Sequence, residues 1–238
     1  MLLAIDTATD QASIALGRAG REPLQEIIGG ARRHAAALLP AIQTLLDRAG
    51  LSLRQVSGVV VSDGPGSFTG LRVGAAVAKA LVHAGGFPLW VAPSLMVRAA
   101  GVAKDEALIL AVSNALRGEV YAAAYRFLGN RIQTELQASV QRPAALVTGV
   151  LRPEIVVGEA PPEIVAELEA WIGQPVIGPP VGSPHAAKLL ELVGQSGGAS
   201  LVDAVSKWEP IYGRPAEAQA RWEIAHGRPL PDSVGSSR

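Results

Sequence analysis

The chain has no cysteine, no net charge and no long apolar run. The absence of cysteine excludes disulfides, thiolate nucleophiles and thiolate metal sites, and is typical of a reducing compartment. Lys and Arg number 21 and Asp and Glu number 21, so the formal net charge is +0 at pH 7. No overall attraction would therefore hold nucleic acid or an anionic membrane, and a solitary RNA-binding protein is not expected.

The start of the chain also lacks the features of an export signal. No basic region precedes the short apolar run 2–5, and the carboxylate of Asp6 follows it at once. No later segment reaches the roughly 18 uninterrupted apolar residues that a membrane span needs. The sequence therefore predicts a cytoplasmic protein without membrane association.

What the chain does have is the composition and patterning of a globular α/β protein. Its 238 residues are 49% hydrophobic and 18% charged, which fits one large domain or two small ones. Short apolar or alternating runs separated by turns predict strands, and apolar residues at three- and four-residue spacing predict helices. In the first part of the chain the predicted strands cover 2–5, 12–16, 23–28, 58–62 and 89–92, and the predicted helices cover 35–49, 70–83 and 94–103.

The same order of strands restarts about a hundred residues later, which indicates an internal repeat. Strands are predicted over 107–112, 120–127 and 132–138, and then strands over 155–157 and 176–177 alternate with helices over 162–171 and 184–193. We therefore predict two similar α/β halves, residues 1–103 and 104–215. Residues 216–238 are predicted to form a helix over 216–225 and a disordered end.

Two turns have the composition of phosphate-binding loops. Asp6 and Thr7 lie in a strand-to-strand turn, where amides can face an anion and the carboxylate can order a cation. Gly64 and Gly66 lie between a buried strand and a helix, where free amides can bind an anion. Both turns are equally compatible with a purely structural role, because Asp, Thr and Gly all favour tight turns. No Lys-Ser/Thr pair follows the glycines, so the loop is not a Walker loop.

Residues for a metal site or for hydrolysis are not evident. No two histidines stand at helical ligand spacing or beside grouped carboxylates, and no serine lies in a nucleophile-elbow pattern. The four histidines are His34, His83, His185 and His226. Two helices instead offer smooth faces, a Leu/Ile face over 35–49 and a Gly/Ala face over 70–83. Core packing explains such faces, and a helical-bundle interface with a partner explains them as well.

Several ordered motifs resemble the bacterial TsaB family, also called YeaZ. The most specific motif is the run from Gly64 to Gly74, GPGSFTGLRVG; the others give support across nearly the whole chain. They are Leu3-Ala4-Ile5-Asp6-Thr7-Ala8-Thr9, Arg33-His34 with Leu38-Leu39-Pro40, Arg117-Gly118-Glu119-Val120-Tyr121, and Glu209-Pro210-Ile211-Tyr212 with Ala216-Glu217.

The resemblance implies a duplicated actin-like fold of the ribonuclease-H-like class and a role in making threonylcarbamoyladenosine next to the anticodon of tRNAs that read codons beginning with adenine. In that family TsaB is the non-catalytic member, the paralogue TsaD carries the metal and transfers the threonylcarbamoyl group, and the ATPase TsaE joins the complex. Homodimers form when TsaB is alone, and tRNA is reached indirectly through the complex. No cofactor is expected, apart from a nucleotide at the partner interface.

Some positions agree with that division of labour and others depart from the family pattern. Ser94 and Arg98 fall approximately where the catalytic paralogue places a His-x-x-x-His metal pair, and neither residue suits a divalent ion. Asn114 stands where the family often has Asp, Leu116 replaces a basic residue, and Gly213 follows Tyr212 where Leu is common. These departures weaken the case for a ligand role of the second-half turn.

The first functional hypothesis is therefore a scaffold that pairs with TsaD through the helices near 34–49 and 70–84. Its predicted interface residues are His34, Leu38, Ile42, Leu45, Leu46, Arg72, Val73, Ala76, Val77 and Ala80. The alternative is an autonomous ATP-dependent phosphotransferase of the actin-like kinase type, with Asp6 and Thr7 near a cation and Gly64 and Gly66 near phosphate. A peptidase is a third possibility, for which the sequence offers no nucleophile or metal pair.

Overall fold

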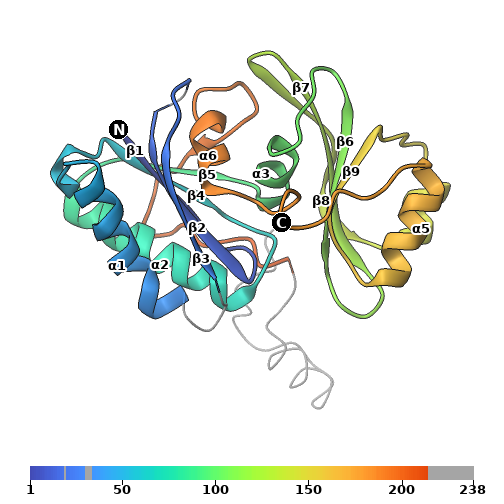
Figure 1. Ribbon diagram of the computed structural model, residues 1–238, viewed down its shortest axis with the longest axis horizontal. Helices are drawn as coiled ribbons and strands as arrows, with labels where there is room; N and C mark the ends of the chain where they lie inside the picture. The colour runs from blue at the N-terminus through green and yellow to red at the C-terminus, as the bar shows by residue number, and fades with distance from the viewer. Residues whose placement is uncertain (19, 30–33, 214–238) are drawn as a thin grey trace.

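The computed structural model describes residues 1–18, 20–29 and 34–213, which form two β-sheets with helices around and between them (Figure 1). The first sheet has six strands in the order β10-β5-β4-β1-β2-β3. In it β1 runs antiparallel to β2 and parallel to β4, and β2 runs antiparallel to β3. The strands are β1 (Leu2–Asp6), β2 (Gln11–Gly17), β3 (Leu24–Gly29), β4 (Gly58–Ser62), β5 (Leu89–Ala92) and β10 (Ser200–Leu201).

The second sheet repeats the pairing of the first. Its order is β8-β7-β6-β9, with β6 antiparallel to β7, β7 antiparallel to β8, and β6 parallel to β9. The strands are β6 (Leu108–Asn114), β7 (Val120–Leu128), β8 (Arg131–Gln141) and β9 (Ile155–Glu159). A parallel bridge between Val157 and Ile177 stands where β5 stands in the first sheet. The prediction of two similar halves in a duplicated actin-like fold is confirmed.

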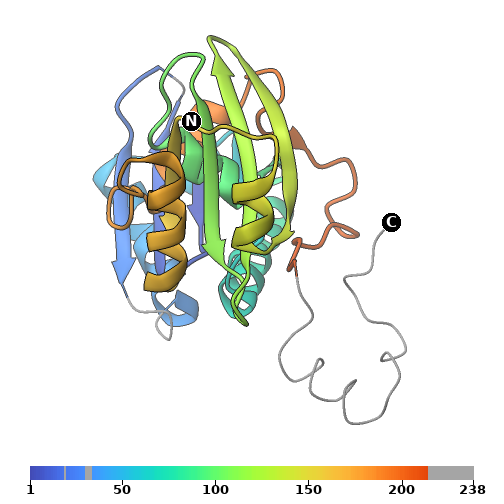
Figure 2. The ribbon, with the colours of Figure 1, turned by 90° about the vertical axis from the view of Figure 1, so that its right-hand side faces the viewer.

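The helices make three layers around the two sheets. The pair α1 (His34–Arg48) and α2 (Phe68–Gly85) covers the outer face of the first sheet, and α3 (Ser94–Ala100) and α6 (Ala186–Leu192) fill the space between the sheets (Figure 1). Figure 2 shows α4 (Pro143–Thr148) and α5 (Pro162–Ile172) lying across the outer face of the second sheet. A single 3-10 turn, η2 (Leu53–Gln55), precedes β4.

Alternation along the strands explains this layering. In β1 the side chains of Leu3 and Ile5 face α1 and α2, whereas Ala4 faces α3 and α6. Successive side chains of a strand point to opposite faces, so a strand that is apolar at every position is buried on both sides. The first sheet is therefore the middle layer of two separate apolar cores, and the polar Asp6 at the end of β1 faces the inner one.

Two helices and one strand pack across the predicted boundary between residues 103 and 104. Helix α3 follows β5 in the first half of the sequence but packs against β6, β7 and β9 of the second sheet. Conversely α6 packs against β1, β2 and β4, and β10 pairs with β5, although both come from the range 104–215. The two halves exchange these elements because each sheet must cover its inner face, and the helix nearest in space does so.

Most of the predicted elements are present, with a few differences at their ends. Helix α2 begins two residues before the predicted start, α3 ends at Ala100, and residues 176–177 make a bridge rather than a strand. The short elements α4 and β10 were not predicted. The predictions for 216–238 lie outside the described residues. Among the described helices, none has the length and apolar character needed to cross a membrane.

Candidate functional site

Buried polar groups gather where β1 and β4 end, between the two sheets. Ile5 lies beside Val61 in this parallel pair, so Asp6 follows on one strand and Ser62 and Asp63 follow on the other. Asp6 and Thr7 are fully buried, Ser62 is 2% exposed and Asp63 is 7% exposed. The carboxyl ends of parallel strands meet at one sheet edge, where actin-like folds and other open α/β folds place their ligands.

Asp6 is a carboxylate with little compensation for its burial. Its Oδ1 accepts a hydrogen bond from the amide of Ala8 at 3.1 Å, whereas its Oδ2 has no hydrogen-bond partner among the described residues. Burial raises the pKa of Asp6, and the neighbouring Ser62 hydroxyl, the Ala8 amide and the charge of Arg98 act in the opposite direction. The Ser62 hydroxyl acts by proximity, since it does not meet hydrogen-bond geometry.

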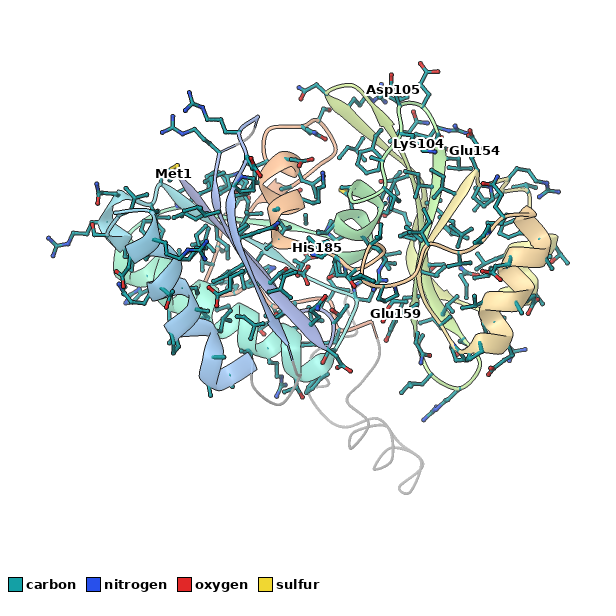
Figure 3. The ribbon with its side chains drawn as sticks, viewed as in Figure 1. Met1, Lys104, Asp105, Glu154, Glu159 and His185 are labelled. Carbon is teal, nitrogen blue, oxygen red and sulfur yellow. The ribbon has the colours of Figure 1, made fainter. Side chains whose placement is uncertain are left out.

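Arg98 of α3 joins the two halves at this point. It is 1% exposed, its Nη2 lies 3.1 Å from Oε1 of Glu159 at the end of β9, and its Nη1 donates to the carbonyl of Gly182 at 2.8 Å. Burial lowers the pKa of Arg98, and the charges of Glu159 and Asp6 counteract that effect. Figure 3 labels Glu159 and His185 in this region between the sheets. The guanidinium therefore pairs with Glu159 of the second sheet, and its charge also acts on Asp6 of the first sheet.

The glycines of the 64–74 motif are explained by close packing within the chain. A side chain at Gly64 would meet the backbone carbonyl of Ile211, and one at Gly66 would meet that of Ala8. At Gly70 it would meet the carbonyl of Thr7, and at Gly74 the hydroxyl of the same residue. The N-terminal turn of α2 is thus pressed against the β1–β2 turn.

Asp6, Thr7, Gly64 and Gly66, which the sequence predicts to form phosphate loops, are closely packed in the fold. Asp6 and Thr7 are closed to solvent, and protein backbone occupies the space beside both glycines. A phosphate cradle needs that space and needs amides that face the ligand. Asp6, Thr7 and Gly64 therefore leave no room for a phosphate beside them, whereas Gly66 also lines an open cavity. Within the described ranges, no group of three or more metal-ligating side chains is present either.

The tight fit predicts a loss of stability for Gly70→Ala. The added methyl group would meet the Thr7 carbonyl, which is held in the turn after β1, so we expect unfolding to become easier by about 1–3 kcal/mol. Urea denaturation measures the change. Gly29→Ala is the matched control, because its new methyl group would meet nothing within 4 Å and should change stability little. Equal stability of the two variants would contradict the packing account.

An open cavity of about 950 Å³ lies beside this junction, between the turns of the two halves. It is lined by the β1–β2 turn, the start of α2, the β6–β7 turn and Glu159.

The β6–β7 turn is held in a left-handed conformation. Leu116 and Arg117 have positive φ angles, 63° and 56°. Asn114 Oδ1 holds the turn by accepting a hydrogen bond from the amide of Leu116 at 2.8 Å. Asn114 thus supplies the turn contact that an Asp at this position would also make, and Leu116 is 60% exposed.

The structure divides the predicted interface residues into two groups. Four side chains of α1 pack on the first sheet and are at most 3% exposed, so they belong to the core and are not available to a partner; they are Leu38, Ile42, Leu45 and Leu46. On α2, Arg72, Ala76 and Ala80 are exposed and Val73 and Val77 are half-buried. The side chain of His34 lies outside the described residues. The spacing of the apolar residues in α1 therefore marks the face that packs against the first sheet.

The predicted interface did not include the exposed residues of α1 that lie beside these core residues. Leu39 is 51% exposed, and Pro40 beside it is exposed as well. The three- and four-residue spacing places Leu39 on the same apolar face as Leu38 and Ile42, so the spacing alone does not show that Leu39 points outward. The outward surface of α1 and α2 therefore includes Leu39, Arg72, Ala76 and Ala80.

Residues 208–212, which we call the strap, run beside α2 and join the two halves. Lys79 Nζ lies 2.7 Å from Oε1 of Glu209 and 5.7 Å from the ring centre of Trp208. The amide of Ile211 donates to the carbonyl of Asp63 at 2.6 Å. The Tyr212 ring packs on Phe68 with 4.7 Å between ring centres, and its carbonyl accepts the hydroxyl of Tyr121 at 3.5 Å. The sequence singled out this segment, but only the fold shows what it contacts.

Comparison with known proteins gives one family. The model of the family described as "TsaD: tRNA N6-adenosine threonylcarbamoyltransferase" matches residues 26–162. The tRNA threonylcarbamoyladenosine biosynthesis protein TsaB of Escherichia coli is 30% identical over 225 residues, which cover 89% of this chain and 93% of that protein. The Bacillus subtilis protein of the same name is 33% identical over 126 residues, which cover 53% of this chain and 55% of that protein.

A solved structure extends the similarity to the whole fold. The structure of YeaZ from Pseudomonas aeruginosa is similar to this chain with a TM-score of 0.72 and 27% identity, over 89% of this chain and 98% of that one. A second Pseudomonas aeruginosa structure, described as an uncharacterized protein with similarity to peptidase YeaZ, gives the same TM-score at 28% identity. The similarity thus covers both halves and the helices that they exchange.

Proposed function

This chain belongs to the TsaB family, and on that premise we propose that it acts in tRNA threonylcarbamoyladenosine biosynthesis as a non-catalytic scaffold for a TsaD-type catalytic subunit. The observation that carries the proposal is the state of the fold's ligand site. Its Asp6 is fully buried, and the buried Arg98 pairs with Glu159 and acts on Asp6 through its charge. Asp6 itself is therefore closed to a substrate, although Glu159 lines the open cavity beside it.

The proposed partner surface is the outward face of α1 and α2. Its exposed residues include Leu39, Arg72, Ala76 and Ala80, on two helices that lie side by side over one sheet (Figure 1). Small residues let a partner helix approach closely, and apolar area buried there stabilises association at roughly 25 cal/mol per Å². The same face would serve a homodimer when the partner is absent, because helical-bundle interfaces commonly pair like with like.

Reconstitution tests the proposal. We expect this protein and the TsaD of the same organism to co-elute on gel filtration, and tRNA modification by TsaD, TsaE and threonylcarbamoyl-AMP to require the addition of this chain. Leu39→Asp should weaken co-elution strongly, because it places a charge in the apolar contact, whereas Gln43→Asp on the same helix changes an exposed polar residue and should do less. Failure to co-elute, with and without TsaE and nucleotide, would contradict the scaffold role.

The remaining features of the proposal follow from the same surface. We place tRNA contact mainly on the partner, since this chain has a formal net charge of +0, and we place the process in the cytoplasm. We also propose that a nucleotide binds at the interface between the subunits and not in the open cavity of this chain. The autonomous phosphotransferase has no observation in its favour, and absence of ATP-Mg binding in calorimetry would remove it.

A further inference from the structure

Arg72 is the one α2 cation that the structure orders without neutralising it, within the described residues. Its guanidinium carbon lies 4.3 Å from the ring centre of Phe68 and 5.7 Å from that of Tyr212. The two rings are themselves in contact and, with Ala8 and Leu71, form a small apolar cluster. No described carboxylate lies within ion-pair distance of Arg72, although its side chain is exposed at the surface.

Lys79, seven residues further along α2, is in the opposite situation. Its ammonium group lies 2.7 Å from the Glu209 carboxylate, and the strap therefore satisfies its charge within the chain. The strap thus makes a different kind of contact with each of the two cations of α2. It neutralises Lys79 with Glu209 and holds Arg72 on an aromatic face with Tyr212.

We propose that Arg72, ordered by Phe68 and Tyr212, is a specificity-determining residue of the partner surface, where it binds a carboxylate of the partner subunit. A guanidinium stacked on aromatic rings keeps its N–H edge free, and that edge matches a carboxylate in two parallel hydrogen bonds. Because the rings already restrict the side chain, little conformational freedom is lost on binding. Arginines in such positions are frequent among the residues that dominate interfaces. This inference rests on the scaffold function proposed above.

The surroundings of Arg72 favour a protein over a nucleic acid as the source of the anion. The other exposed positions of α2 near it, Thr69, Ala76 and Ala80, are small and uncharged, and Val73 and Val77 are half-buried beside them. Binding to a phosphate backbone draws on several unpaired cations. Here the next cation along the helix, Lys79, is already paired. One free guanidinium beside an apolar stripe fits one acidic side chain at the edge of a packed helix interface.

The experiment measures the affinity of the full-length protein for the TsaD of the same organism by calorimetry at two salt concentrations. We expect Arg72→Ala to weaken binding by about tenfold or more and to reduce its dependence on salt, and Arg72→Glu to weaken it further. Arg72→Lys keeps the charge but loses the planar fork, and should give an intermediate affinity. Lys79→Ala is the matched control and should change affinity by less than about threefold, since exposed, internally paired charges contribute little.

Each outcome bears on a different statement. Unchanged affinity of Arg72→Ala, with a wild-type complex still forming, would overturn the inference and leave the scaffold function intact. Equal losses for Arg72→Ala and Lys79→Ala would also overturn it, because they would indicate a general charge effect. Loss of tRNA binding by Arg72→Ala without loss of TsaD binding would assign the residue to RNA. Absence of any complex with the unaltered protein would instead remove the scaffold function. Circular dichroism and thermal unfolding confirm that each variant is folded.

Discussion

Replacing Arg98 with methionine is expected to destabilise the protein by about 3 kcal/mol, because Asp6 would stay buried without the nearby positive charge and the Gly182 carbonyl would lose its hydrogen bond. The Arg98 side chain is almost completely buried, and its loss would leave Asp6 facing the inner core with one hydrogen bond from Ala8. Glu159 contributes less to the penalty, since 43% of its side chain is exposed and water screens its charge. Urea unfolding at pH 7 measures the change.

The control for this prediction is a cycle of variants. Glu159→Gln should cost clearly less than Arg98→Met, because the side chain at position 159 reaches solvent and the new amide can be hydrated there. Adding Asp6→Asn to Arg98→Met should recover part of the stability, because without Arg98 the buried Asp6 must either keep an uncompensated charge or take up a proton, and asparagine does neither. If Asp6→Asn gives no recovery in the Arg98→Met background, Asp6 and Arg98 are not coupled, and the account of this junction is wrong.

Arg98 also shows which parts of the site the sequence could predict. Its position in the chain predicts that no metal pair forms at residues 94 and 98, but gives no indication that the guanidinium reaches across to Glu159, 61 residues later. Such a contact depends on α3 leaving its own half to pack on the second sheet. Local patterning reports the face that a helix buries, and it does not report which sheet provides the surface.

The same distinction explains why the predicted interface residues of α1 prove to be core residues. The apolar period of α1 correctly predicts a helix and a buried face, and the face is turned to the helix's own sheet, so Leu45 is a core residue. The glycine motif of residues 64–74 is specific to the family, yet the reason for its glycines is contact with the β1–β2 turn. The succession of strands along the chain and its duplication could be predicted, because turns and alternation are local properties of the sequence. The contacts between the halves could not be predicted, because they depend on the assembled fold.

Replacing Asp63 with asparagine is expected to stabilise the protein at neutral and alkaline pH. Asp63 is 7% exposed, its Oδ1 has no hydrogen-bond partner among the described residues, and burial raises its pKa to about 7 from 3.8. The folded protein therefore holds a proton that the unfolded chain releases above about pH 4. Stability is lost as the pH rises from about 4 to 7, and the loss is constant above that range.

Asparagine removes this penalty because it is neutral at every pH. The two pKa values differ by an amount that corresponds to roughly 4 kcal/mol, which is the upper limit of the gain expected at pH 8, and the gain should vanish near pH 4. Urea unfolding of the Asp63→Asn variant and of the parent at a series of pH values measures it. Asp203→Asn, which alters an exposed carboxyl, serves as the control. A gain that is the same at pH 4 and pH 8 would show that Asp63 is ionised in the folded protein throughout, with an ordinary pKa.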